Sequence, residues 1–286
     1  MKITSIIENT SKTGLPVEHG LSLYIQLENG QNVLFDMGQS SLFAENASRL
    51  GLCIADVDTS IISHGHYDHG GGLCTFLRLN EKANVYIHKD AFMPHYSLRE
   101  TGLRYIGIDK ELQTSKQIIL CGSQTQISED MRLFADVQGT CFCPHGNRLL
   151  FEATSNSPRG EIETDIKPSI VHDLFIHEQN LIIEEGDNVV LFAGCAHKGI
   201  INILRKAEEV IGRKPTHVLA GMHLVKSGLD ENAETSFIHA LANELASYKQ
   251  TKFYTMHCTG EQQFLKLKEI MNTQIEYLSC GDSIVI

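Results

Sequence analysis

The chain has 286 residues, 42% of them hydrophobic, and a formal net charge of −11 at pH 7. This length and apolar content suit one large core, and the acidic balance argues against nucleic acid or an anionic membrane surface as a partner. The first residues lack the apolar segment of a secretory signal, and no apolar run approaches the ~18 residues of a membrane span. We therefore expect a cytoplasmic protein whose eight cysteines are reduced thiols.

In the first part of the chain, strand-like and helix-like segments alternate. Apolar residues at 21–25 and 33–35 flank a turn that contains an Asn-Gly pair, which predicts a hairpin. Residues 41–52 have apolar side chains at helical spacing and predict a short helix, with Gly51 as its stop. The segment 58–63 then predicts a short buried strand that ends directly before His64.

The second part repeats this order. The predicted elements are a hairpin at 180–195, a helix at 198–212, a strand at 216–222, a helix at 230–248, a strand at 252–257, a helix at 260–272 and a closing strand at 282–286. Two such halves predict an α/β fold in which two sheets face each other with helices outside. Residues from about 89 to 170 show no clean periodicity, and we expect them to form an elaboration over the site within a single domain spanning 1–286.

The segment HGHYDH places three histidines and one aspartate within six positions, followed by Gly70, Gly71 and Gly72. Imidazoles and carboxylates are standard ligands for zinc, and imidazole also suits iron. His64 and His66 alternate, so on an extended segment they point the same way. Asp68 and His69 follow at a glycine-rich turn, where they can reach a second ion. Four donors in so short a segment predict a metal site rather than a polar loop.

This segment resembles the first metal motif of the metallo-β-lactamase superfamily, and the resemblance extends along nearly the whole chain. The segments FAGCAHKGIINIL, AGMHL, HCTG and SCGDSIVI resemble one branch of it. That branch is named for an archaeal enzyme, 7,8-dihydropterin-6-ylmethyl-4-(β-D-ribofuranosyl)aminobenzene 5′-phosphate synthase, and includes bacterial metal-dependent hydrolases. The resemblance implies a four-layer αββα sandwich of two mixed β-sheets flanked by helices.

The open end of the predicted hairpin at 180–195 carries candidates for the remaining metal ligands. His177 and Cys195 each lie nine residues from Gly186, so a symmetric turn would place them opposite each other, whereas a slip of one residue would turn one of them away. The resemblance implies that this end supplies the third histidine of the first ion and a bridging acid. His177 would be that histidine, and Cys195 would stand where aspartate is common. His197, two residues after Cys195, is an alternative ligand in place of either His177 or Cys195. It directly precedes a predicted helix, whose first N–H groups can also hold an anion.

The resemblance also implies roles for residues at other strand ends. His257 would complete the second ion with Asp68 and His69. His223 would contact the substrate or a ligand and act with Asp68 in catalysis, and a helix-capping role is its alternative. His19 and Asp36 would lie near the site, where Asp36 can orient a ligand imidazole. The sequence assigns no role to the remaining histidines, which are His88, His95, His145, His172, His217 and His239.

Two divalent ions, zinc by preference with iron or manganese as alternatives, can activate a water and polarise a carbonyl or phosphoryl oxygen. We therefore predict a metal-dependent hydrolase of an ester, amide or phosphate. The alternatives are the synthase condensation of the named branch, a di-iron redox protein and a metal-binding protein without turnover. The partner would be a small molecule. Arg159, Lys198 and Lys226 are candidates for holding an anionic one, although solvated charge is the more common explanation for each. A homodimer is one option for the oligomeric state.

Overall fold

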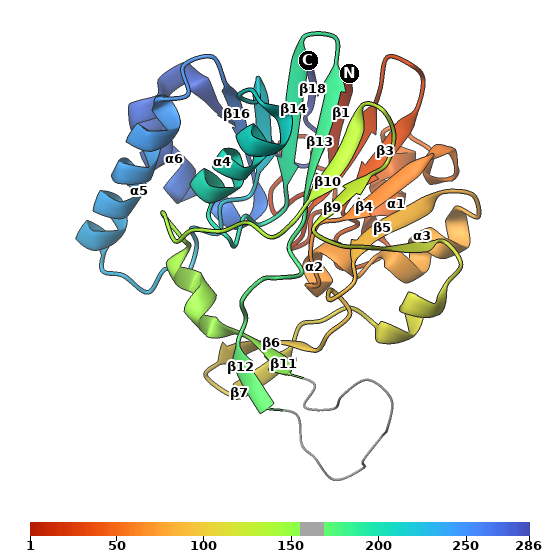
Figure 1. The fold of residues 1–286 in the computed structure, drawn as a ribbon, viewed down its shortest axis with the longest axis horizontal. Helices are drawn as coiled ribbons and strands as arrows, with labels where there is room; N and C mark the ends of the chain where they lie inside the picture. Colours follow the sequence, from red (N-terminus) through yellow and green to blue (C-terminus); the bar gives the residue numbers. More distant parts are fainter. Residues whose placement is uncertain (155–168) are drawn as a thin grey trace.

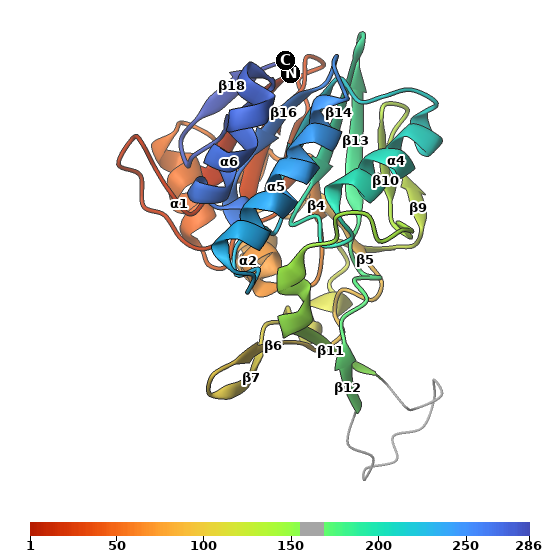
Figure 2. The same cartoon turned by 90° about the vertical axis from the view of Figure 1, so that its left-hand side faces the viewer.

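The computed structural model describes residues 1–154 and 169–286. Two seven-stranded sheets pack face to face, and helices cover both outer faces (Figures 1 and 2). The six α-helices of the described residues are α1 (Leu42–Arg49), α2 (Tyr67–Gly70), α3 (Leu73–Leu79), α4 (Ile200–Ile211), α5 (Glu231–Ala246) and α6 (Glu261–Met271). This arrangement confirms the predicted four-layer αββα sandwich. No helix in the described ranges is long and apolar enough to cross a membrane.

The first sheet contains most of the N-terminal half together with the last strand. Its strands, in spatial order, are β18 (Ser283–Val285), β1 (Lys2–Ile7), β2 (Ser22–Gln26), β3 (Asn32–Phe35), β4 (Thr59–Ile62), β5 (Asn84–His88) and β8 (Ile118–Cys121). The pairs from β18 to β3 are antiparallel, and those from β3 to β8 are parallel. The sheet is therefore mixed, and the predicted hairpin of β2 and β3 is present.

The second sheet has the same mixed character. Its strands, in spatial order, are β17 (Ile275–Tyr277), β16 (Lys252–Thr255), β15 (His217–Ala220), β14 (Asn188–Ala193), β13 (Asn180–Glu185), β10 (Met131–Phe134) and β9 (Gln124–Gln126). The pairs from β17 to β14 are parallel, and those from β14 to β9 are antiparallel. Short β17 has no clear strand signal in the sequence and was not predicted.

Three hydrophobic clusters account for the layers. One fills the space between the two sheets, with Phe35 and Phe192 in ring contact at 5.8 Å. A second lies between the first sheet and helices α1 and α3, and a third lies between the second sheet and helices α4, α5 and α6. Because burial of apolar area is the main stabilising term, at about 25 cal/mol per Å², these clusters fix the sheets that carry the site.

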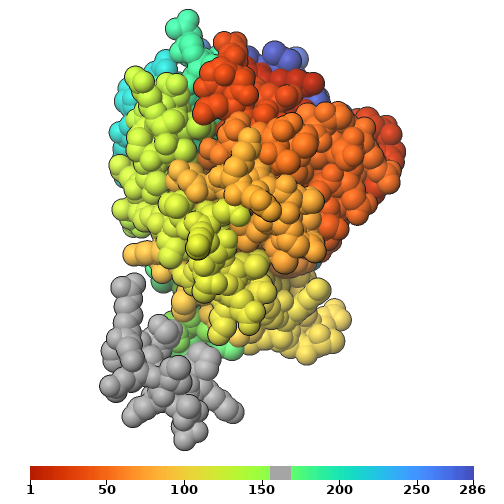
Figure 3. All heavy atoms as spheres, turned by 90° about the vertical axis from the view of Figure 1, so that its right-hand side faces the viewer, coloured from red at the N-terminus to blue at the C-terminus, as the bar shows by residue number. Residues whose placement is uncertain are grey.

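The segment predicted as an elaboration, about 89 to 170, has two parts. Strands β8, β9 and β10 join the main sheets. In Figure 3 the yellow and yellow-green residues of this segment pack directly against the orange residues of the N-terminal half. A separate four-stranded sheet is formed by β12 (Ser169–His172), β11 (Leu150–Thr154), β6 (His95–Arg99) and β7 (Gly102–Tyr105). This small sheet stands below the sandwich in Figure 1. The segment thus adds strands to the sandwich and builds an additional sheet, and the 3-10 helices Lys110–Thr114 and His145–Leu149 lie in its connecting loops.

Two local predictions differ from the structure. The β13–β14 hairpin pairs Leu181 with Phe192 and Glu185 with Asn188, so its centre lies between Gly186 and Asp187 and not at Gly186. The pairing is thus shifted by one residue from the assumed one, and His177 and Cys195 both lie beyond the ends of the paired strands. The predicted glycine-rich turn after His66 begins with the short helix α2, which carries Asp68 and His69, and the turn itself is at Gly71 and Gly72 before α3.

The three glycines after this motif serve close packing. None of them has a positive φ. A Cβ on Gly71 would collide with the backbone oxygens of Gln39 and Tyr67, and one on Gly72 would collide with that of Met37. Their absent side chains therefore let α2 lie directly against the loop after β3.

Candidate metal centre

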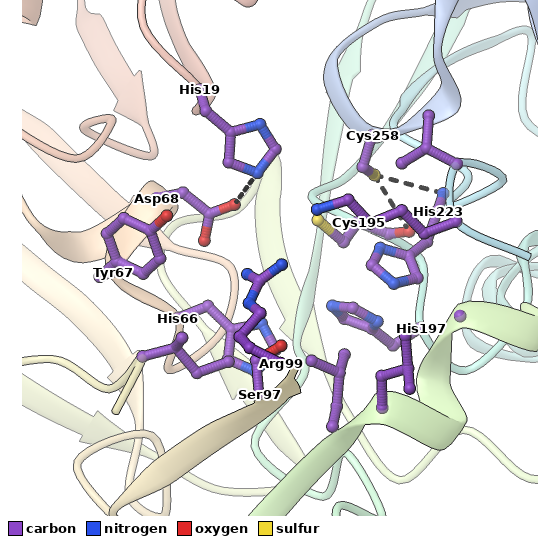
Figure 4. A pocket seen from close by; sticks show the side chains of 16 residues that line it. His19, His66, Tyr67, Asp68, Ser97, Arg99, Cys195, His197, His223 and Cys258 are labelled. Carbon is purple, nitrogen blue, oxygen red and sulfur yellow. Dashed lines mark hydrogen bonds and ion pairs between the residues drawn. The ribbon is translucent and has the colours of Figure 1, made fainter. Parts of the chain in front are cut away.

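The predicted ligands gather at the ends of strands from both sheets, on the side that faces the small sheet. His66 and Asp68 follow β4, Cys195 and His197 follow β14, and His257 follows β16. A pocket opens beside them, lined by His19, His66, Tyr67, Asp68, Cys195, His197, His223 and Cys258 among others (Figure 4). Residues far apart in the sequence thus converge because parallel strands end at one edge of each sheet.

His64 and His66 lie side by side, with ring centroids 4.6 Å apart, as their alternation predicts. Ser63 fixes the tautomer of His64. The Ser63 hydroxyl donates to Asp36 Oδ2 at 2.8 Å, so it accepts the hydrogen bond from His64 Nδ1 at 2.9 Å. Nε2 of His64 therefore carries a lone pair, and it is buried without a partner.

Asp36 also orients His69, which confirms its predicted role. Nδ1 of His69 donates to Asp36 Oδ2 at 2.6 Å, and Nε2 lies 3.1 Å from Cys195 Sγ. Burial opposes a charge on this imidazole, but the Asp36 carboxylate raises the pKa of His69 to about 9. A cation bound at Nε2 would take the place of that proton.

His197 is held on two sides. Its Nδ1 donates to Asn147 Oδ1 at 2.9 Å, and the amide N–H groups of His197 and Lys198 donate to the Glu178 carboxylate at 2.6 and 2.9 Å. The Glu178 side chain thus occupies the N–H groups that were expected to hold an anion, and burial raises the pKa of Glu178 to about 7 in spite of these bonds. Nε2 of His197 is buried without a partner, and its ring lies 5.0 Å from that of His64 and 5.1 Å from that of His66.

His257 follows β16 in a left-handed backbone conformation, at φ 53°. Its amide donates to Glu8 at 2.7 Å, and its Nδ1 donates to Asn9 Oδ1 at 2.9 Å. Its Nε2 lies 3.4 Å from Asp68 Oδ2 and has no hydrogen-bond partner. The end of β1 therefore positions this imidazole, and the lone pair of Nε2 faces Asp68.

Cys195 stands between the two groups of ligands. One donor atom of each of His64, Cys195 and His197 lies within 4.8 Å of the others, and the same holds for His69, Cys195 and His257. Burial and the neighbouring Cys258 thiol raise the pKa of Cys195, so the thiol stays protonated unless a cation displaces its proton. The Cys195 thiol is therefore within reach of both groups of imidazoles.

The buried Nε2 atoms of His64, His197 and His257 are the observation that supports metal binding. Each ring donates its Nδ1 proton to an oxygen, which leaves Nε2 as an unprotonated donor facing the cluster. Burial lowers the pKa of His64 and of His197, which keeps both rings neutral. Neutral imidazoles oriented through the other nitrogen are the arrangement that metal ions require.

His177 is engaged differently. Its Nδ1 accepts a hydrogen bond from the Gly65 amide at 3.0 Å, so the ring proton lies on Nε2, which donates to Asp173 Oδ2 at 3.1 Å. His177 also belongs to a buried group with His66, His95 and Asp173 whose donor atoms lie within 4.8 Å of one another. The prediction that His177 is a ligand stays a prediction, and in this tautomer neither nitrogen has a free lone pair.

Asp173 is the centre of that buried group. Its Oδ2 accepts from His95 Nδ1 at 3.2 Å and lies 3.7 Å from His66 Nε2. At that distance Nε2 of His66 has no hydrogen-bond partner among the described residues, and it is buried like Nε2 of His64 and of His197. The sequence analysis assigned no role to His95 and did not consider Asp173, whose four-residue spacing from His177 was the one available signal.

The Asp173→Asn variant is expected to bind metal about 10- to 100-fold more weakly, without a change in the number of ions at saturation. Asparagine keeps the size of the side chain but removes the buried charge that faces His66. Competition with a chelating dye measures the affinity, and Asp187→Asn, in the exposed turn between β13 and β14, is the control. Unchanged affinity in Asp173→Asn would show that Asp173 does not position His66.

His19, His223 and Cys258 complete the pocket (Figure 4). His19 Nε2 lies 3.2 Å from Asp68 Oδ2, which places His19 near the site as predicted. Burial opposes the charge of Asp68, but the hydrogen bond from His19 and the neighbouring imidazoles of His257 and His69 hold its pKa well below the usual range. The His223 amide donates to Cys258 Sγ at 3.2 Å, and the His223 ring lies 4.4 Å from that of His197.

The three candidate anion-binding residues are in different places. Lys226 lines the pocket, whereas the Lys198 amino group donates to the backbone oxygen of Leu174 at 3.3 Å. Arg159 lies outside the described residues. Arg99, which the sequence analysis did not single out, also lines the pocket.

A sequence profile of the metallo-β-lactamase superfamily matches residues 15–241, and the chain belongs to that superfamily. It is 31% identical over 279 residues to an uncharacterized protein of Methanocaldococcus jannaschii, covering 94% of this chain and 95% of the relative. It is 25% identical over 293 residues to the 7,8-dihydropterin-6-methyl-4-(β-D-ribofuranosyl)-aminobenzene-5′-phosphate synthase of the same organism, covering 98% of this chain and 95% of the relative.

Among solved structures, the chain is similar to Tm1679, described as a metal-dependent hydrolase of the β-lactamase superfamily. The TM-score is 0.77 with 30% identity, and the match covers 100% of this chain and 99% of that one. The isothiocyanate hydrolase from Delia radicum gut bacteria matches with a TM-score of 0.53 and 13% identity, covering 100% and 99% of the two chains. The second likeness concerns the fold alone.

Proposed function

We propose that this chain is a metal-dependent hydrolase with a dinuclear centre. His64, His66 and His197 hold one ion, Asp68, His69 and His257 hold the other, and Cys195 bridges them. The observation that carries the proposal is the convergence on Cys195 of buried imidazoles whose Nε2 lone pairs have no partner. Similarity to a metal-dependent hydrolase at 30% identity over the whole chain supports the reaction class.

The donor set favours zinc, because imidazole nitrogens and a thiolate suit a borderline-soft cation better than they suit magnesium or calcium. Iron or manganese remain the alternatives. Two such ions would supply Lewis acidity and a lowered pKa for water.

The residues of the chain supply the rest of the chemistry. Asp68 is held as a carboxylate by His19 and His257, so it can accept a proton from an attacking water. His223 lies across the pocket from Asp68 in Figure 4, where it can contact a leaving group. Hydrolysis of an ester, an amide or a phosphate needs both steps: water must lose a proton, here to Asp68, and the leaving group must gain one, here from His223.

A second candidate is a condensation like that named for the synthase relative, which is 25% identical over 98% of this chain. The same centre would then bind and orient two substrates instead of an attacking water. A redox protein or a metal-binding protein without turnover is the alternative of another class.

Metal analysis combined with an activity panel tests the proposal. The purified protein is expected to hold about two ions and to hydrolyse at least one phosphodiester, lactone or thioester. Chelation should abolish turnover, and zinc should restore it. His66→Ala should lose turnover while its secondary structure by circular dichroism is unchanged. A metal-loaded protein that hydrolyses no compound in the panel would count against a hydrolase and favour the alternatives.

A further inference from the structure

Two cationic side chains reach the pocket from elements unrelated in sequence. Arg99 is the last residue of β6 in the small sheet, and Lys226 lies in the loop that follows β15. Both line the pocket together with His66, Asp68 and Cys195. In the view of Figure 4, the Arg99 side chain reaches between Asp68 on one side and Cys195 and His223 on the other.

These two cations have no carboxylate partner. Eight other lysines and arginines form ion pairs within 4.0 Å, whereas no ion pair of the described residues includes Arg99 or Lys226. Asp68 is the one acid among the described residues of the pocket lining, and it already contacts His19 and His257. In the part of the chain that the structure describes, no carboxylate therefore pairs directly with Arg99 or Lys226, and Asp68 acts on Lys226 only at longer range.

The two charges also act on each other. Burial lowers the pKa of Lys226, and the Arg99 charge lowers it further. Bringing like charges together is unfavourable, and an anion placed between them removes that cost. Both side chains are exposed to solvent, so a ligand can reach them.

The loop that carries Lys226 is fixed on both sides. Lys226 has a left-handed backbone, at φ 58°, which is uncommon for a lysine. The preceding Val225 amide donates to the Cys258 carbonyl at 3.3 Å, and the following Ser227 hydroxyl donates to Glu234 at 2.9 Å. These bonds anchor the loop to the residue next to His257, so Lys226 keeps a defined position relative to the centre.

The rest of the pocket lining describes the remainder of the ligand. Ser97 and Tyr67 add neutral hydroxyl groups beside Arg99 and Asp68. The apolar side chains of the lining are Ile106, Leu149, Leu150 and Val225. A ligand that fits this wall has an apolar body and a compact anionic group.

We propose that Arg99 and Lys226 form a subsite for an oxyanion group, phosphate or carboxylate, on a substrate with an apolar body. An arginine fork and a lysine ammonium suit such a group because together they donate several charge-assisted hydrogen bonds. The assignment of the ligand as substrate rests on the proposed function, whereas the binding of the anion does not. The subsite selects the substrate, and the ligands around Cys195 act on it.

Calorimetric titration of the metal-free protein at low salt tests the subsite apart from the ions. Phenyl phosphate and benzoate are the anionic probes, and benzyl alcohol is the neutral one. At least one anion should bind more tightly than benzyl alcohol, and Arg99→Gln and Lys226→Gln should each weaken it about tenfold or more. Tighter phenyl phosphate binding assigns phosphate, and tighter benzoate binding assigns carboxylate.

Arg49→Gln and Lys110→Gln remove one charge each at exposed positions away from the pocket and should bind the anion like the wild type. Thermal unfolding checks that each variant is folded. Equal anion binding in the wild type and in the double variant Arg99→Gln/Lys226→Gln would overturn the subsite. Lost anion binding in that variant, with no hydrolysis by the metal-loaded wild type, would keep the subsite and refute the hydrolase.

Discussion

Replacing His197 by alanine is expected to lower the number of bound ions from about two to about one and to abolish hydrolysis. The lone pair of His197 Nε2 faces the cluster, and Asn147 holds the ring there through Nδ1. Loss of a direct ligand should weaken the affected ion by more than the 10- to 100-fold typical of supporting residues. Metal content after dialysis, measured by mass spectrometry, gives the stoichiometry, and a chelating dye gives the affinity.

The matched variant is His177→Ala, which removes the same kind of ring from the other candidate position. Its Nδ1 accepts from Gly65 and its Nε2 donates to Asp173, so we expect two ions to remain and affinity to fall by about 10- to 100-fold. Loss of one ion from His177→Ala, with two retained by His197→Ala, would reverse the assignment and make His177 the ligand.

The choice between these two histidines shows where the sequence stops being informative. His64, His66, Asp68 and His69 are close in the chain, so local spacing was enough to bring them together. Whether His177 and Cys195 face each other depends on the strand register. The centre of the hairpin lies between Gly186 and Asp187, half a residue from the assumed centre, which shifts the pairing by one residue. His177 and Cys195 also lie beyond the paired strands Asn180–Glu185 and Asn188–Ala193, so the loops at the hairpin end, which no alternation pattern encodes, decide where the two side chains point.

The fold was more predictable than the residues that support the site. Hairpins, helices and buried strands follow from periodicity, and most predicted elements are present within a few residues. Glu8 and Asn147 act through hydrogen bonds to His257 and His197, and Asp173 places a carboxylate oxygen 3.7 Å from His66 Nε2. All three supporting residues are far in the chain from these histidines. No local pattern encodes such a partner, and the segment around residues 89–170 has little periodicity of its own.

Cys195 is the residue on which the number of ions depends most directly. Cys195→Ala should retain about one ion and lose hydrolysis, because its Sγ lies within reach of both groups of imidazoles. Cys195→Asp should retain two ions, but its preference should shift from zinc toward manganese or iron, since a carboxylate is a harder ligand than a thiolate. Metal competition between zinc and manganese measures that shift.

Cys258→Ser provides the matched control, because Cys258 is a second buried thiol whose Sγ is within 4.8 Å of a donor atom of Cys195 and of His223. Cobalt substitution separates the two thiols, since a thiolate bound to cobalt gives a sulfur-to-metal charge-transfer band. The band should be absent from Cys195→Asp and present in Cys258→Ser. The reverse pattern would make Cys258 the metal ligand and leave Cys195 as a packed thiol. Two bound ions in Cys195→Ala would show that the centre forms without a bridging side chain at this position.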